Sequence, residues 1–282
     1  MHARTNMFKT FVLLAGLGGL MVAIGAMFGL GGAVIGLALG LLMVGFSYWK
    51  SDVLAIKAAR AVPADEATMP EYFQIVRDLS ARSGMPMPKL YVTPDRQPNA
   101  FATGRNPEHA AVAVTAGILQ ALTWDELRGV LAHELSHVGN RDILIGSVAA
   151  AVATGISFIA NMAMWGAMFG GGSSDDDGPN PIALLATALL APIAAAILQM
   201  ALSRSREFEA DRTGAALIGS GEPLARALLK LEGAARVIPM NVQPAQATKY
   251  IVNPLTGRTV RFANLFTTHP PTAERVARLR SR

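Results

Sequence analysis

Three long stretches without a charged residue dominate the pattern of apolar and polar positions along the chain. The first stretch lies between Lys9 and Lys50, which are the nearest charged residues on either side. A helix of about 20 apolar residues crosses a bilayer core, so this stretch has room for two such helices. We expect them at residues 10–28 and 33–49, with Gly29, Gly31 and Gly32 forming a tight turn between them.

The other two uncharged stretches, residues 143–174 and 178–203, predict a second pair of membrane helices at 143–165 and 181–202. The segment between them, GGGSSDDDGPNP at 170–181, is a polar turn through which no helix would continue. Buried core helices, or a cleaved signal peptide for the first run, are the alternatives. A signal peptide does not continue straight into a second apolar run, so we favour four transmembrane helices.

The distribution of charge predicts how these helices are oriented. All 25 lysines and arginines lie in residues 1–9, 50–142 and 204–282, and the turn at 170–181 carries three aspartates instead. Because positive residues stay on the cytoplasmic side, both termini and the middle segment should be cytoplasmic. The net charge of +5 and the pI of about 9.8 then need no nucleic acid to explain them. With no cysteine in the chain, a disulfide framework, a thiolate metal site and a cysteine nucleophile are excluded.

The pattern between and after the apolar stretches predicts a water-exposed catalytic part that the second helix pair divides in two. The expected organisation is a first transmembrane hairpin at 1–50, a first catalytic segment at 51–142, a second hairpin at 143–203 and a second catalytic segment at 204–282. Helices are predicted at 70–83, 124–140 and 223–235, strands at 89–93 and 111–115, and a hairpin at 250–262. Thr123 and Glu126 have the spacing of a capping box at the start of the second of these helices.

The sequence HELSH at 133–137 carries the chemistry. Residues four apart share one face of a helix, so His133 and His137 can reach the same metal ion. Glu134, beside the first ligand, can reach a water that zinc has acidified and can take its proton. Histidines that lie by chance on a solvated helix are the alternative, and a third ligand further along the chain weighs against it.

A catalytic zinc site uses three protein ligands, and the third should come from the sequence REFEAD at 206–211. Glu207 and Asp211 are four apart and share a helix face, whereas Glu209 points away from Glu207. We therefore favour Glu207 over Glu209 as the ligand, with Asp211 as an outer partner of a ligating histidine. The ion should lie above the membrane edge, because His137 precedes one predicted span and Glu207 follows the next.

These residues predict one zinc ion per subunit and a zinc-dependent endopeptidase. Two other classes remain open: a catalytically silent zinc-binding membrane scaffold, and a transporter. The scaffold is disfavoured because the motif supplies a complete acid–base set. The transporter is disfavoured because no charged residue lies in a predicted span, where ion and proton paths need them. The chain has no glycine fingerprint for a nucleotide.

The chain resembles the HtpX-type heat-shock membrane proteases, which are relatives of the CAAX prenyl endoproteases. HELSH, SRSREFEAD, the closing THPPTAERVARL and the two membrane hairpins carry this resemblance. The resemblance implies an α+β zincin domain of the gluzincin type, with His133, His137 and Glu207 as zinc ligands and Glu134 as catalytic base. It also implies an enzyme of the bacterial inner membrane that cleaves misfolded or membrane proteins under stress.

The resemblance suggests further site residues. In zincins a strand beside the active-site helix holds the substrate in extended form, which places Asn99 and Ala113, of the strand at 111–115, near the substrate. His269, in the sequence THPP, could stabilise the oxyanion of the tetrahedral intermediate. An ordinary loop asparagine and a capping or packing histidine are the alternatives for Asn99 and His269.

Overall fold

The computed structural model describes residues 29–143, 204–238, 240, 250–253 and 270–281, together with scattered residues between 11 and 26. The predicted span at 181–202, all but the first residue of the span at 143–165, most of 10–28 and most of the predicted hairpin at 250–262 lie outside the described residues. Within the described part of the chain, no helix is both long and apolar enough to cross a membrane.

The longest described helix is α2, Gly29–Trp49, which overlaps the predicted span at 33–49. It begins four residues earlier than expected, so Gly31 and Gly32 belong to the helix and do not form a turn. Gly29, at its start, has the positive φ of 84° that glycine adopts without strain. A Cβ atom on Gly36 would lie 2.3 Å from the carbonyl oxygen of Met21, so α2 packs closely against the preceding segment at this glycine.

Four strands form one mixed sheet with the order β1-β2-β4-β3. β2 and β4 are parallel, and the other two pairs are antiparallel. The strands are β1 Val62–Pro63, β2 Lys89–Thr93, β3 Ala100–Gly104 and β4 Ala110–Thr115. The predicted strands at 89–93 and 111–115 are confirmed, and β3 lies at an edge of the sheet. The 3₁₀ turn η1, Pro107–His109, connects β3 to β4.

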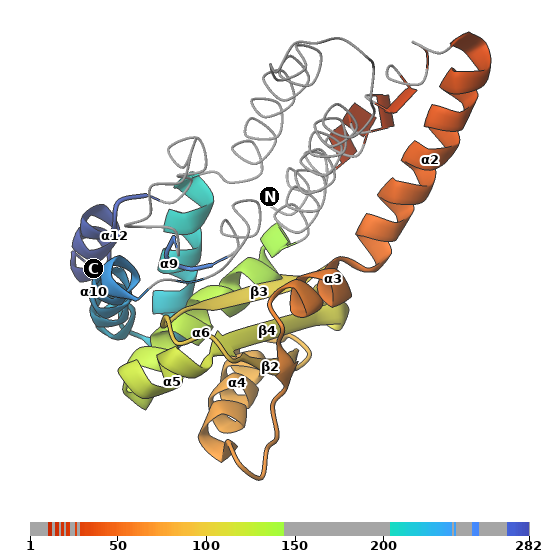
Figure 1. Ribbon diagram of the computed structural model, residues 1–282. Coiled ribbons are helices and arrows are strands. Elements are labelled where there is room, and N and C mark those ends of the chain that lie inside the picture. Colours follow the sequence, from red (N-terminus) through yellow and green to blue (C-terminus); the bar gives the residue numbers. More distant parts are fainter. Residues whose placement is uncertain are drawn as a thin grey trace, which may run out of the picture.

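Helices cover both faces of this sheet (Figure 1). They are α3 Ser51–Ala58, α4 Pro70–Ser83, α5 Ala116–Ala121, α6 Trp124–Gly139, α9 Arg204–Ile218, α10 Glu222–Val237 and α12 Thr272–Arg280. The side chain of Val112 belongs to the main core, which includes residues of α4, α6 and α10. Ala113, one residue later, faces the opposite side and packs in a smaller cluster with Ala55 of α3, as the alternation along a strand requires.

The predicted helices at 70–83, 124–140 and 223–235 correspond to α4, α6 and α10. α6 lies at the centre of the helical layer and contacts α4, α9 and α10. Two segments far apart in the sequence, α6 and α9, therefore lie side by side (Figure 1). Gly214 permits their close approach, because a Cβ atom there would lie 2.9 Å from the backbone nitrogen of His133.

Candidate active site

α6 presents the two motif histidines toward each other. Thr123 and Glu126 form the capping box that starts this helix, as the sequence predicts. The Nε2 atoms of His133 and His137 lie 3.1 Å apart, and their rings are perpendicular at a centroid distance of 4.6 Å. His133 is fully buried, whereas His137 is partly exposed, so one edge of the pair is accessible to solvent.

α9 brings Glu207 to this pair of histidines. Its Oε1 atom lies 3.5 Å from Nε2 of His137, and its Oε2 atom lies 3.8 Å from Nε2 of His133. Glu209, the other candidate for the third ligand, lies on a different face of α9 and forms an ion pair with Arg212. The structure therefore groups Glu207, and not Glu209, with the two histidines.

The three side chains fit a single divalent metal ion. One ligand atom from each of His133, His137 and Glu207 lies within 4.8 Å of the other two. Ligands about 2.1 Å from a tetrahedral zinc ion lie about 3.4 Å from each other, close to the spacings in this cluster. Imidazole nitrogen and carboxylate oxygen are donors that zinc accepts, so the geometry and the chemistry of the donor set agree.

Each histidine has a carboxylate on its other ring nitrogen. Nδ1 of His133 lies 2.9 Å from Oδ1 of Asp211, and Nδ1 of His137 lies 3.2 Å from Oδ2 of Asp142. Such partners fix the ring so that its Nε2 lone pair faces the metal position. Burial lowers the pKa of His133 to about 4. Burial alone would also lower the pKa of His137, but Asp142 and the charge of Glu207 raise it to about 9.

Glu134 is buried between the metal position and the edge of the sheet. The backbone N–H of Ala102, in β3, donates a hydrogen bond to its carboxylate. Burial raises the pKa of Glu134 to about 7, and the charge of Glu207 also raises it. A group with a pKa near neutrality is suited to accepting a proton and returning it.

Ala113, one of the two residues predicted to bind the substrate, lies on an interior strand of the sheet. β4 lies between β2 and β3, so Ala113 pairs with Tyr91 on one side and Phe101 on the other. Both edges of β4 are therefore occupied by neighbouring strands, and contact of Ala113 with a substrate stays a prediction. β3 is the edge strand, and the N–H of its Ala102 points toward Glu134.

The Asn99 side chain is fully buried and is bound to the protein's own backbone. Its Nδ2 donates to the carbonyl of Val252 at 2.8 Å, and its Oδ1 accepts from the N–H of Val252 at 3.4 Å. These bonds hold the segment 250–253 beside the start of β3. Contact of Asn99 with a substrate stays a prediction, and His269 lies outside the described residues.

Two site residues were missed by the sequence argument. Asp142 lies only five residues after His137, so its position just beyond the motif helix was an available signal. Arg275 lies 64 residues from Asp211, and its side chain forms two hydrogen bonds with that carboxylate. Burial would raise the pKa of Asp211, but Arg275 and His133 instead lower it well below its usual range.

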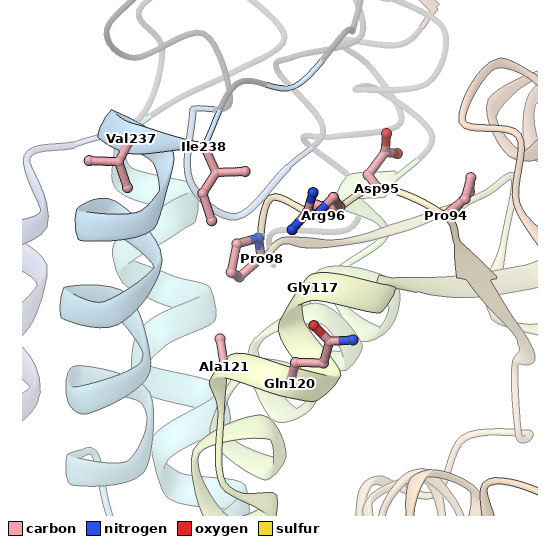
Figure 2. Close-up of a pocket in the computed structure, with 9 residues that line it drawn as sticks. All are labelled: Pro94, Asp95, Arg96, Pro98, Gly117, Gln120, Ala121, Val237 and Ile238. Atoms are coloured by element: carbon pink, nitrogen blue, oxygen red, sulfur yellow. The ribbon is translucent and has the colours of Figure 1, made fainter.

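A cavity of about 710 Å³ lies elsewhere on the surface, between the loop after β2, the helix α5 and the end of α10 (Figure 2). Arg96, Gln120 and Ile238 are among the residues that line it. None of the grouped histidines and carboxylates belongs to its lining, so the metal cluster does not depend on this cavity.

The HExxH helix, the third acidic residue on α9 and the adjoining β-sheet define a metalloprotease, and the chain belongs to peptidase family M48, whose model matches residues 66–282. Two of its relatives are named Protease HtpX homolog, from Pelotomaculum thermopropionicum and Syntrophobacter fumaroxidans. They are 52% and 53% identical to this chain, and each alignment covers 97% of the chain and 98% of the relative. A homologue of the same name from Burkholderia mallei is 50% identical.

A crystal structure of S. mikatae Ste24p has a similar fold. The superposition has a TM-score of 0.52 at 21% identity and covers 98% of this chain and 65% of that chain. At this identity the likeness concerns the fold alone.

Proposed function

We propose that this protein is a membrane-anchored, zinc-dependent endopeptidase that cleaves misfolded or membrane proteins at the cytoplasmic face of a bacterial inner membrane, in protein quality control under stress. One observation carries the catalytic part of the proposal. The ligand atoms of His133, His137 and Glu207 lie close enough together to bind one metal ion. Glu134 lies next to His133 on α6, the helix that carries both histidines. The relatives' names, which call them proteases, support the same reaction class.

The two histidines and Glu207 would hold one zinc ion. Zinc bound there would supply a Lewis acid that polarises the substrate carbonyl and acidifies a water molecule. Glu134 would take a proton from the attacking water and then return it to the departing amine, as a general base followed by a general acid. The hydrogen bond from Ala102 holds this carboxylate beside the outer edge of β3.

We expect an extended substrate to pair with the outer edge of β3 beyond Ala100, because no other strand of the described residues pairs there and Ala100 is already bonded to Ile251. All residues of β3 are in register with β4, but in an antiparallel pair only alternate residues exchange hydrogen bonds, so the backbone groups of the residues between them face outward. Pairing by backbone hydrogen bonds would be independent of side-chain sequence, which suits a protease that acts on unfolded segments. The role of His269 as an oxyanion donor and the role of Asp211 as a histidine partner belong to the same proposal.

The membrane part of the proposal is supported by the charge pattern. The uncharged stretches of the sequence are long enough for four spans, and every lysine and arginine lies outside them. Both termini and the two catalytic segments, 51–142 and 204–282, would then share the cytoplasmic side. Fusing a reporter enzyme at the turn 170–181 and at the C-terminus tests this: activity of a periplasm-specific reporter at the C-terminus would contradict it.

The catalytic part is tested by separating metal binding from hydrolysis. Full-length wild type, Glu134→Gln, Glu207→Gln and Glu209→Gln are purified in detergent, and zinc content and cleavage of unfolded casein are measured. We expect Glu134→Gln to keep zinc and lose cleavage, Glu207→Gln to lose zinc, and Glu209→Gln to resemble wild type. Zinc in the wild type with no cleavage would favour the silent scaffold, and equal cleavage by wild type and Glu134→Gln would overturn the mechanism.

A further inference from the structure

Arg275 is the largest of the fully buried side chains in the described part of the chain, with 2% of its surface exposed. An arginine remains charged in a protein, and a buried charge is costly unless it is paired and hydrogen-bonded. This guanidinium has such partners, and they lie on different segments. It belongs to α12, yet its contacts are in α9, in the segment 250–253 and in α6, where Nη2 lies 3.4 Å from both ring nitrogens of His133.

The first contact joins Arg275 to the partner of a metal-site histidine. Nε donates to Oδ2 of Asp211 at 2.9 Å, and Nη2 donates to Oδ1 at 2.7 Å. Two parallel bonds of this kind fix both the position and the plane of a carboxylate. Oδ1 of Asp211 is also the atom that lies 2.9 Å from Nδ1 of His133. The arginine therefore sets the acceptor that orients the His133 ring.

The second contact joins Arg275 to the segment 250–253, which lies beside β3, the strand where we expect the substrate to pair. Nη1 donates to the carbonyl of Ile251 at 3.1 Å, and the N–H of Ile251 donates to the carbonyl of Ala100 at 3.1 Å. Ala100 is the first residue of β3, the edge strand that supplies Ala102 to Glu134. Nη1 also lies 3.6 Å from Oε2 of Glu207. One planar group thus reaches the third ligand, a histidine partner and the segment beside β3.

We propose that Arg275 is a positioning residue of this active site. Through Asp211 it fixes His133 for the metal, and through Ile251 it fixes the segment that borders β3. This inference rests on the proposed function, because it assigns Arg275 a task toward the zinc ligands. It predicts that the geometry of the guanidinium fork matters in addition to its charge, since a lysine offers one nitrogen and cannot reproduce the two parallel bonds.

Zinc affinity, which does not depend on catalysis, tests the proposal. Metal-free full-length protein in detergent is titrated with zinc against a competing chromophoric chelator, for wild type, Arg275→Met, Arg275→Lys and the control Arg280→Met. Arg280 lies on the same helix but pairs with Glu222 at the surface. We expect affinity to fall about 10–100-fold in Arg275→Met, as for loss of an outer-sphere partner, and to stay unchanged in Arg280→Met. In Arg275→Lys it should fall at least several-fold.

Circular dichroism of each metal-free variant shows whether it is folded. If Arg275→Met does not fold, Arg275→Lys decides: folded protein with reduced affinity supports the proposal, and folded protein with wild-type affinity overturns it. A double-mutant cycle with Asp211→Asn tests whether Arg275 influences zinc affinity through Asp211. Loss of affinity in the double variant close to that of one single variant supports action through Asp211, and full additivity overturns it.

The outcomes also separate this inference from the proposed function. Wild type that binds no zinc and cleaves no casein would refute the proposed function. Wild type that binds zinc and cleaves casein, alongside Arg275→Met and Arg275→Lys with unchanged affinity, would refute only the positioning role of Arg275.

Discussion

Replacing Gly214 by alanine should force apart the two helices that carry the metal cluster. Glu207, Asp211 and Gly214 are spaced at i, i+4 and i+7 and share the face of α9 that meets α6. A Cβ atom on Gly214 would lie 2.9 Å from the backbone nitrogen of His133 and 3.1 Å from the carbonyl carbon of Ala132. Backbone atoms of a buried helix cannot rotate away, so the helices themselves must move.

The size of the effect follows from these distances. Non-bonded contacts are comfortable at about 3.5 Å, so α9 must retreat by about 0.6 Å near His133. Forcing an extra carbon into a packed interior costs about 1–3 kcal/mol. The same shift exceeds the tolerance of about 0.2 Å in metal–ligand distances. We therefore expect lower stability and a zinc affinity that is weaker by about tenfold or more, comparable to the loss of an outer-sphere partner.

Gly233→Ala is the matched control for Gly214→Ala. Gly233 also lies inside a helix, α10, but it is exposed and a Cβ atom there would meet nothing within 4 Å. Both substitutions gain the same helix propensity, about 1 kcal/mol, so their difference isolates the packing cost. Thermal unfolding in detergent and zinc titration are measured for both. Equal stability of the two variants, with wild-type zinc affinity in Gly214→Ala, would refute the close-approach argument.

Two further predictions concern contacts away from the metal. Burial would raise the pKa of Glu126, but its hydrogen bonds with Lys230 and Thr123 outweigh burial and lower it. A carboxyl whose pKa is lower in the folded state stabilises above its unfolded pKa, about 4.3, and loses that contribution as the pH falls through the folded value. Wild type should therefore unfold less readily than Glu126→Gln at pH 7, and denaturant titrations should show this difference shrinking below about pH 4; a difference independent of pH would contradict the assignment. Asn99→Ala should lower the free energy of unfolding by about 1–3 kcal/mol, because it leaves the buried carbonyl and N–H of Val252 without their hydrogen-bond partner. Wild-type stability together with a raised KM for casein would instead indicate contact of Asn99 with the substrate.

The elements whose formation is local were predictable from the sequence. The capping box of Thr123 and Glu126 starts α6 through bonds within four residues, and the helix presents His133 and His137 four residues apart on one face. The amphipathic pattern at 70–83 and the short apolar runs at 89–93 and 111–115 likewise needed only neighbours in the chain. The helix α2 begins at Gly29 and not after the glycines, since glycine permits a turn without requiring one.

Tertiary structure decided what depends on segments distant in the sequence. The order of the strands places β4 in the interior and β3 at the edge, which the alternation of apolar residues cannot reveal because both strands are buried. The choice between Glu207 and Glu209 is settled by which face of α9 meets α6, at Gly214. The contacts of Arg275 with Asp211 and Ile251 span 64 and 24 residues, so they arise only when α12 packs against the site. Local spacing therefore determined which residues could bind a metal, and packing between remote helices determined which of them meet.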